Sequence, residues 1–237
     1  MKRLGLIGGM SWESTATYYQ LLNEGIRNRM GGLHSAELLL WSFDFAEIEA
    51  LQAAGDWQRA TTRMIEVAKA LEHASADALL ICTNTMHRMA EAIEESCDIP
   101  LLHIADATAV AIKARDSHNP LLLGTRFTME QDFYKGRLLA CHGIDVRIPE
   151  MDEREVIHRI IYDELCQGEV RTDSRSAYQE IIERAVSDGA DSVILGCTEI
   201  GLLIEQQGFE IPVFDTTTLH VDAALNFMLP NASPPSS

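Results

Sequence analysis

Short apolar runs recur along the chain and alternate with longer stretches that have a helical pattern of apolar residues. Runs of this kind are typical of strands that are buried in a parallel sheet. The expected strands are Leu4–Ile7, Glu37–Trp41, Ala78–Cys82, Leu101–Ile104, Pro120–Leu123, Asp145–Ile148, Ser192–Leu195 and Val213–Phe214. Helices are expected between many of them, for example at Asp56–His73 and Ser176–Ser187. The alternation predicts an α/β fold with mostly parallel sheets.

The pattern also repeats within the chain. The segment Asp77–Thr83 resembles Asp191–Cys197, and this alignment pairs Thr83 with Cys197. At nearly the same interval, Gly8 pairs with Gly124, because each follows an apolar strand. The repeat predicts two pseudo-symmetric doubly wound parallel-sheet domains. Ligands of such sheets bind at the carboxyl ends of the strands, so the active site is expected in the cleft between the domains.

The expected domain boundaries follow from this repeat. Residues 1–105 form a first α/β domain, completed by a C-terminal helix at about 217–229. Residues 106–216 form the second α/β domain. The Pro- and Ser-rich tail, 230–237, is expected to be disordered.

Composition and charge argue against several classes of protein. A net charge of −17 disfavours nucleic-acid binding, because an acidic surface repels phosphate. We expect no membrane span, because no run of about 18 apolar residues occurs, and the short apolar N-terminus does not resemble a signal peptide. The five cysteines are widely spaced with no C-x-x-C pair, which predicts reduced thiols, a cytoplasmic location and no metal site.

The segment Gly196-Cys197-Thr198-Glu199 is the strongest chemical signal in the sequence. It follows an apolar run and precedes a helix-like stretch. A cysteine at a strand end near a helix N-terminus is placed where the thiolate is favoured. The alternative is that Cys197 is a small buried hydrophobic residue, which is a common role for cysteine.

The equivalent segment of the first half is Cys82-Thr83-Asn84-Thr85-Met86-His87. Its short polar side chains can bind a ligand, or they can simply cap the following helix. His87 is as consistent with a structural role as with a catalytic one. In the second half, the turn Gly124–Thr128 carries two threonines and Arg126, which could bind a carboxylate or lie in solvent.

Taken together, these motifs resemble the aspartate/glutamate racemase family. The matching motifs are Gly8-Gly9-Met10-Ser11, Asn84-Thr85-Met86-His87, Leu123-Gly124-Thr125 with Thr128, and Gly196-Cys197-Thr198-Glu199. The resemblance extends from Lys2 to about Leu229. It implies an isomerase without pyridoxal phosphate or metal, in which two cysteines flank the substrate Cα and exchange its proton. It also implies a small-molecule amino-acid substrate and a possible homodimer.

The sequence departs from the family pattern at one catalytic position. In the family the first cysteine directly precedes Asn-Thr, whereas Thr83 occupies that position here and Cys82 is one residue earlier. We therefore expect Cys197 to be the base and Thr83 to be the opposing proton donor. A hydroxyl cannot readily begin the reaction, so the two directions should be unequal. The family geometry suggests that the L enantiomer faces Cys197.

The resemblance also predicts the residues that bind the substrate. These are Met10, Gln52, Asn84, Thr85, Thr125, Thr128, Thr198 and Glu199. A neutral Gln52 suits a polar side chain at least as well as a carboxylate, so broad specificity is as consistent as strict use of aspartate or glutamate. His87, Arg88 and Arg126 are the basic residues that could receive a second carboxylate. The alternatives are a related isomerase or decarboxylase of the same fold, and a two-lobed small-molecule-binding protein without catalysis.

Overall fold

The structure is a computed structural model that describes residues 1–230. The chain forms two compact units: Met1–His103 with the segment from His220, and Ile104–Leu219. Apart from Pro230, the tail expected to be disordered, 230–237, lies outside the described residues. Within residues 1–230, no helix is both long and apolar enough to cross a membrane.

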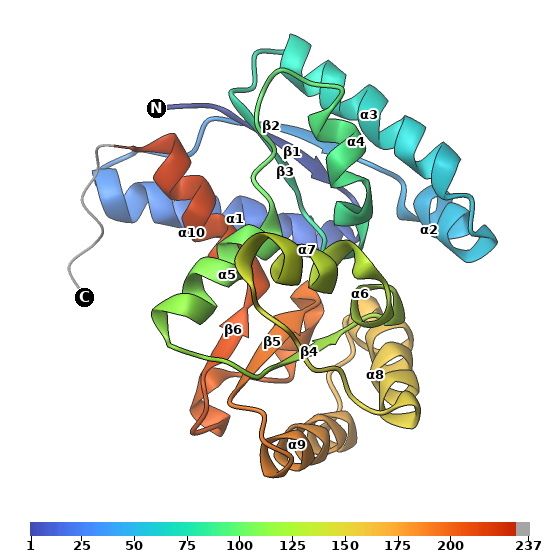
Figure 1. The fold of residues 1–237 in the computed structure, drawn as a ribbon. Coiled ribbons are helices and arrows are strands. Elements are labelled where there is room, and N and C mark those ends of the chain that lie inside the picture. The colour runs from blue at the N-terminus through green and yellow to red at the C-terminus, as the bar shows by residue number, and fades with distance from the viewer. Residues whose placement is uncertain (231–237) are drawn as a thin grey trace. The chain divides into compact units, whose positions relative to one another are not determined.

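The first unit is built on a parallel sheet of order β2-β1-β3, with helices on both faces (Figure 1). Its strands are β1 (Leu4–Gly8), β2 (Leu38–Ser42) and β3 (Ala78–Ile81). Apolar residues of the helices α2 (Phe45–Ala54), α3 (Trp57–His73) and α4 (Ala90–Glu94) and of the 3₁₀ helix η1 (Thr85–Met89) cover one face. Those of α1 (Trp12–Met30) and α10 (Thr216–Met228) cover the other.

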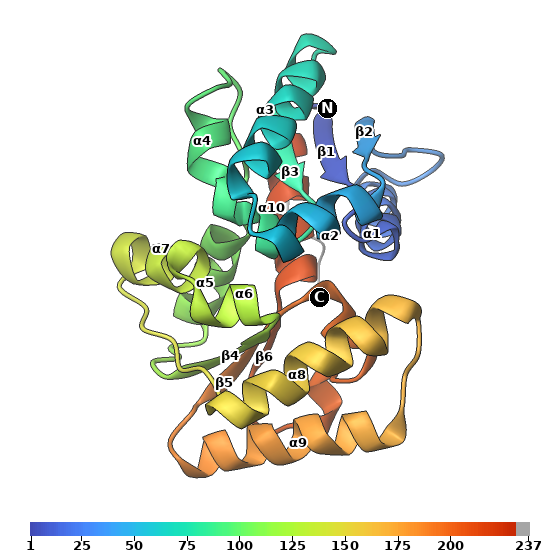
Figure 2. The same cartoon turned by 90° about the vertical axis from the view of Figure 1, so that its right-hand side faces the viewer.

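The second unit repeats this design with the parallel order β4-β5-β6 (Figure 1). Its strands are β4 (Pro120–Gly124), β5 (Ser192–Gly196) and β6 (Val213–Asp215). One face carries α8 (Met151–Asp163) and α9 (Thr172–Ser187), and the other carries α5 (Ile104–Ala114) and α7 (Asp132–His142) (Figure 2). The shorter elements are α6 (Arg126–Glu130), η2 (Leu165–Gln167), η3 (Thr198–Leu202) and η4 (Gln206–Gly208).

Matching contacts in the two units reveal the internal repeat. At the start of the first sheet, Asp77 accepts a hydrogen bond from the backbone N–H of Arg3 at 2.6 Å. At the start of the second, Asp191 accepts the equivalent bond from Asn119 at 3.1 Å. Each unit is thus an independently wound α/β layer structure, and the predicted fold class is confirmed.

Two of the eight expected strands are wrong. The segments Leu101–Ile104 and Asp145–Ile148 contribute only isolated parallel bridges, Leu79 with Leu101 and Leu121 with Arg147. Each segment is next to a proline, Pro100 or Pro149, which has no N–H to extend a ladder. Ile104 is instead the first residue of α5.

The expected helices match the structure more closely. The Asp56–His73 pattern forms α3, with Asp56 as its N-cap, because the Asp56 carboxylate accepts a bond from the backbone N–H of Arg59 at 3.1 Å. The Ser176–Ser187 pattern lies within α9 and ends where that helix ends.

Candidate active site

The predicted site residues of the first unit lie at the carboxyl ends of the parallel strands β1 and β3. Met10 follows β1, and Thr83 follows β3, so both lie at the same edge of the sheet. Gln52 of α2 reaches this edge, because its Nε2 lies 3.1 Å from Sδ of Met86 in η1. Four of the predicted side chains are buried: Met10, Gln52, Asn84 and Thr85. Thr83 itself is partly exposed.

Cys82 has a different environment from its neighbour Thr83. Its side chain lies in the apolar cluster beneath α1 and α10, with Tyr18 and Leu80. Burial raises the pKa of the Cys82 thiol well above its ordinary value. A thiol held protonated among apolar groups is suited to packing rather than to proton transfer.

In the second unit, two glycines let the ends of β4 and β5 approach closely. Gly124 pairs with Gly196. A Cβ on Gly196 would lie 2.8 Å from the carbonyl oxygen of Leu123, which is too close for any real side chain. Thr125 then caps α6, and its Oγ1 lies 3.3 Å from both the backbone N and the Oγ1 of Thr128. Both threonines are buried.

Cys197 directly follows β5 and is followed by the 3₁₀ helix η3. Its Sγ donates to Oε2 of Glu199 at 3.0 Å, and Oγ1 of Thr198 donates to the same oxygen at 2.5 Å. The buried carboxylate therefore receives two short hydrogen bonds from its neighbours. A thiol and a potential proton acceptor are already in contact.

The electrostatics of Cys197 differ from the expectation. Burial first, and then the negative charge of Glu199, raise the pKa of the Cys197 thiol well above its ordinary value. The five-residue 3₁₀ helix does not outweigh these two effects, so the resting group is a thiol, and the predicted preference for thiolate is wrong in this structure. Cys197 needs a base to become ionised.

The residues at these two strand ends agree with the family that the whole sequence matches. Residues 7–224 match the profile of the family described as Asp/Glu/Hydantoin racemase. The chain belongs to this family. Its membership makes the protein a racemase, an enzyme of the isomerase class, and confirms the predicted family and reaction.

Two solved structures extend the likeness over nearly the whole chain. A proposed Asp/Glu racemase from Yersinia pestis is 52% identical, with a TM-score of 0.91 over 97% of this chain and 100% of that one. An aspartate racemase homologue from Pyrococcus horikoshii OT3 is 34% identical, with a TM-score of 0.83 over 96% and 99%. The broad specificity amino-acid racemase RacX of Bacillus subtilis is 25% identical over 65% of this chain and 66% of its own length.

The three basic residues considered for a second substrate carboxylate have separate environments. His87 is buried, and its Nδ1 lies 2.8 Å from the carbonyl oxygen of Thr83. The guanidinium of Arg88 stacks 4.5 Å from the ring centre of Trp57. Arg126 is exposed at the start of α6, next to the buried Thr125. Arg88 and Arg126 are both exposed, and Arg126 is the one that lies next to a predicted substrate-binding threonine.

Two features of the racemase were missed by the sequence reasoning. Glu199 was predicted to bind substrate, yet it contacts the catalytic candidate Cys197 itself. The histidines His87, His103 and His220 form a buried cluster in the first unit. The position of Glu199 two residues after the cysteine was a usable signal, whereas three histidines scattered over the chain gave none.

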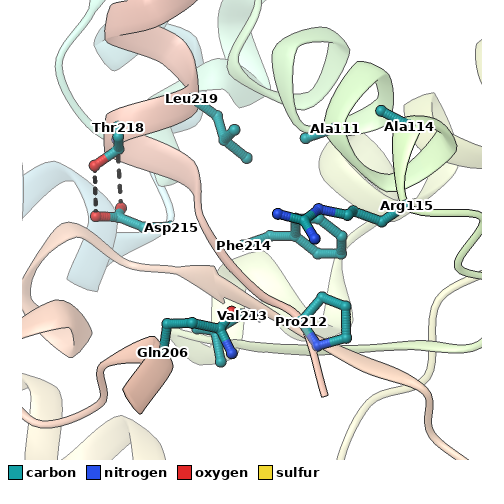
Figure 3. Close-up of a pocket in the computed structure, with 10 residues that line it drawn as sticks. All are labelled: Ala111, Ala114, Arg115, Gln206, Pro212, Val213, Phe214, Asp215, Thr218 and Leu219. Atoms are coloured by element: carbon teal, nitrogen blue, oxygen red, sulfur yellow. Dashed lines mark hydrogen bonds between the residues drawn. The ribbon is translucent and has the colours of Figure 1, made fainter. Parts of the chain in front are cut away.

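A surface cavity of about 330 Å³ in the second unit lies away from these residues. It runs beside β6 and contains none of the predicted site residues (Figure 3). The Asp215 carboxylate at its edge accepts a bond from Oγ1 of Thr218 at 2.9 Å, which secures the start of α10. Across residues 1–230, no group of three or more His, Cys, Asp or Glu side chains could hold a metal ion.

Proposed function

We propose that this racemase interconverts the enantiomers of acidic and small polar amino acids, with Cys197 as the base and Thr83 as the opposing proton donor. The observation that carries the proposal is the 3.0 Å contact between Sγ of Cys197 and Oε2 of Glu199 at the end of β5. This contact joins the group that must ionise to a group that can take its proton.

The first step forms the thiolate. The Glu199 carboxylate accepts the Cys197 thiol proton, and the resulting thiolate removes the α-proton of the substrate. The raised pKa of the thiol suits this role, because a more basic thiolate is a stronger base toward a weakly acidic carbon. Thr198 donates to the same carboxylate oxygen and keeps it directed at the sulfur.

The second step delivers a proton to the opposite face of the carbon. The Thr83 hydroxyl gives its proton to Cα, and the alkoxide recovers one from solvent. Cys197 retains the proton it removed, and Glu199 releases the original thiol proton to solvent, which restores the carboxylate. A threonine hydroxyl has no ionised form near neutral pH, so it cannot start the reverse reaction as readily. We therefore expect faster proton removal from the enantiomer that faces Cys197, which we propose is the L form.

The remaining predicted residues would hold the substrate. Buried polar groups stabilise charge that develops on the α-carboxylate when the carbon loses its proton. We propose that this role belongs to Asn84, Thr85, Thr125 and Thr128, since the Thr198 hydroxyl already donates to Glu199. Met10 and Gln52 would then contact the substrate side chain.

The substrate class follows from two different polar groups. Arg126 would attract the second carboxylate of aspartate or glutamate, whereas Gln52 would accept neutral polar side chains. The relatives support both: one is named as a broad specificity racemase and another as an aspartate racemase homologue. Chiral chromatography of the amino acids incubated with the protein tests the substrate class, and Arg126→Gln should reduce turnover of acids more than that of serine.

Replacing Thr83 tests the two-group mechanism. Thr83→Cys places a second ionisable group at that position and should accelerate initial α-proton exchange from the enantiomer that faces Thr83 by about tenfold or more. Exchange from the enantiomer that faces Cys197 should change less. Equal effects on exchange from both enantiomers, or none, would remove Thr83 from the mechanism.

We also propose that the racemase is a cytoplasmic homodimer. None of the five cysteines forms a disulfide bond, which suits a reducing compartment. The strand β2 is at the edge of its sheet, and its Leu40 and Trp41 side chains are 47% and 42% exposed. An exposed apolar edge strand offers unpaired backbone groups with which a second chain can pair. Trp41→Lys should make the protein monomeric, as measured by light scattering, whereas the control Trp12→Lys on α1 should leave the dimer intact. A monomeric wild type would rule out the dimer.

A further inference from the structure

Three buried histidines form a cluster around His87, whose ring contacts the Thr83 carbonyl. They come from η1, the segment before α5, and α10: His87, His103 and His220. The ring centres of His87 and His103 are 4.6 Å apart, and those of His87 and His220 are 5.6 Å apart. The proposed mechanism uses none of these rings.

Hydrogen bonds to backbone carbonyls define the protonated nitrogens. A carbonyl oxygen can only accept, so Nδ1 of His87 carries the hydrogen that it donates to the Thr83 oxygen at 2.8 Å. In the same way, Nε2 of His220 donates to the Leu102 oxygen at 2.6 Å. When His220 is neutral, its Nδ1 accepts from the Tyr18 hydroxyl at 2.9 Å.

The cluster favours neutral rings. Burial, followed by repulsion from His103 and His220, lowers the pKa of His87 well below its ordinary value. Burial lowers the pKa of His220 to about 4. Near neutral pH, His87 is therefore a neutral ring whose Nδ1 donates to the Thr83 carbonyl, and it brings no net charge near Thr83.

The bond from His87 also fixes the orientation of a peptide group. The carbonyl of Thr83 and the N–H of Asn84 belong to one planar trans peptide, in which they point in opposite directions. With the carbonyl held toward the His87 ring, the Asn84 N–H is directed away from the ring. A backbone N–H held in a fixed direction is a preorganised donor for an anion.

We propose that His87 is a positioning residue, which holds the Thr83–Asn84 peptide so that the Asn84 N–H faces the substrate α-carboxylate. The inference rests on the proposed racemase function and assigns the α-carboxylate to this donor. His87 touches no reacting atom. Its effect is transmitted through the backbone of the residue that donates the proton.

The chain contains its own controls for this bond. Nδ1 of the exposed His73 makes the same contact with the carbonyl four residues earlier, that of Lys69, at 2.7 Å. The side-chain amide of Asn23 donates a bond of the same kind to the carbonyl oxygen of Tyr19, four residues earlier, at 2.7 Å. An asparagine at position 87 can thus replace the imidazole donor, and His73→Leu removes an equivalent bond far from the site.

The test compares ligands that differ only at the α-carboxylate. For wild type, His87→Leu, His87→Asn and His73→Leu, we would measure the KM of a racemised amino acid and the inhibition constant of its α-carboxamide. His87→Leu should raise the KM by about tenfold, as expected for one lost hydrogen bond to a charged group, and change the carboxamide constant less than about twofold. The other two variants should resemble wild type.

Different results would overturn the role of His87 and the racemase function. Equal losses for both ligands, no loss in His87→Leu, or the same loss in His87→Asn would overturn the positioning role while the racemase function stands. A wild type that exchanges no amino-acid α-proton would instead overturn the function. If His87→Leu does not fold, His87→Gln replaces it, because its amide extends one atom too far to reproduce the Nδ1 donor.

Discussion

Acid should destabilise the first unit, because it contains histidines that are buried in neutral form. The pKa of His220 is about 4 in the folded chain, against about 6.5 for an unperturbed histidine. Between these values the unfolded chain binds more protons than the folded one, so stability falls as pH drops below about 6.5. From pH 8 to pH 5, His220 alone should lower the free energy of unfolding by about 2 kcal/mol. His87 adds a loss of the same sign, because its pKa is lowered too.

Urea unfolding measured between pH 8 and pH 5 checks this magnitude. His220→Gln removes the titrating ring but keeps an amide for the Leu102 carbonyl, so its free energy of unfolding should depend less on pH than that of wild type by about 2 kcal/mol over this range. His73→Gln, at an exposed site, should keep the wild-type dependence. Carboxylates with lowered pKa values, such as Asp106 and Asp191, lose their contribution at lower pH and do not mask the effect. Identical pH dependence in wild type and His220→Gln would refute the reasoning.

Two further predictions concern the second unit. Glu199→Gln should accelerate iodoacetamide labelling of Cys197 at pH 8 severalfold, because the carboxylate raises the pKa of the thiol. The same variant should slow α-proton exchange by about tenfold, because the group that accepts the thiol proton is lost. Unchanged labelling would contradict the contact between Cys197 and Glu199. Gly196→Ala should lower the free energy of unfolding by about 2 kcal/mol or more, because its Cβ meets the Leu123 carbonyl at 2.8 Å. Gly208→Ala, whose Cβ meets nothing within 4 Å, should cost far less, and equal unfolding midpoints for the two variants would argue against a close strand approach.

The sequence revealed the strand-end segments because local rules produce them. An apolar run buried in a parallel sheet, then glycine, then short polar residues, is visible without tertiary information, and it located the segments around Thr83 and Cys197. The edge segments at Leu101 and Arg147 were overestimated, because flanking prolines limit them to single bridges.

Features that depend on side-chain geometry were not predictable in the same way. The charge of Glu199 was visible in the sequence, but its 3.0 Å contact with Cys197 depends on the conformation of η3. Burial of the thiol, followed by this contact, reversed the expected ionisation of Cys197. The histidine cluster joins residues from three distant segments, so no local pattern could indicate it.

The role of Cys197 as the base is tested most directly by initial deuterium incorporation at Cα in heavy water, starting separately from the L and D enantiomers. Wild type and Cys141→Ala, an exposed cysteine on α7, should both incorporate deuterium faster from the L form. Cys197→Ala should incorporate none from either enantiomer. Exchange that persists at the wild-type rate in a folded Cys197→Ala protein would contradict the account.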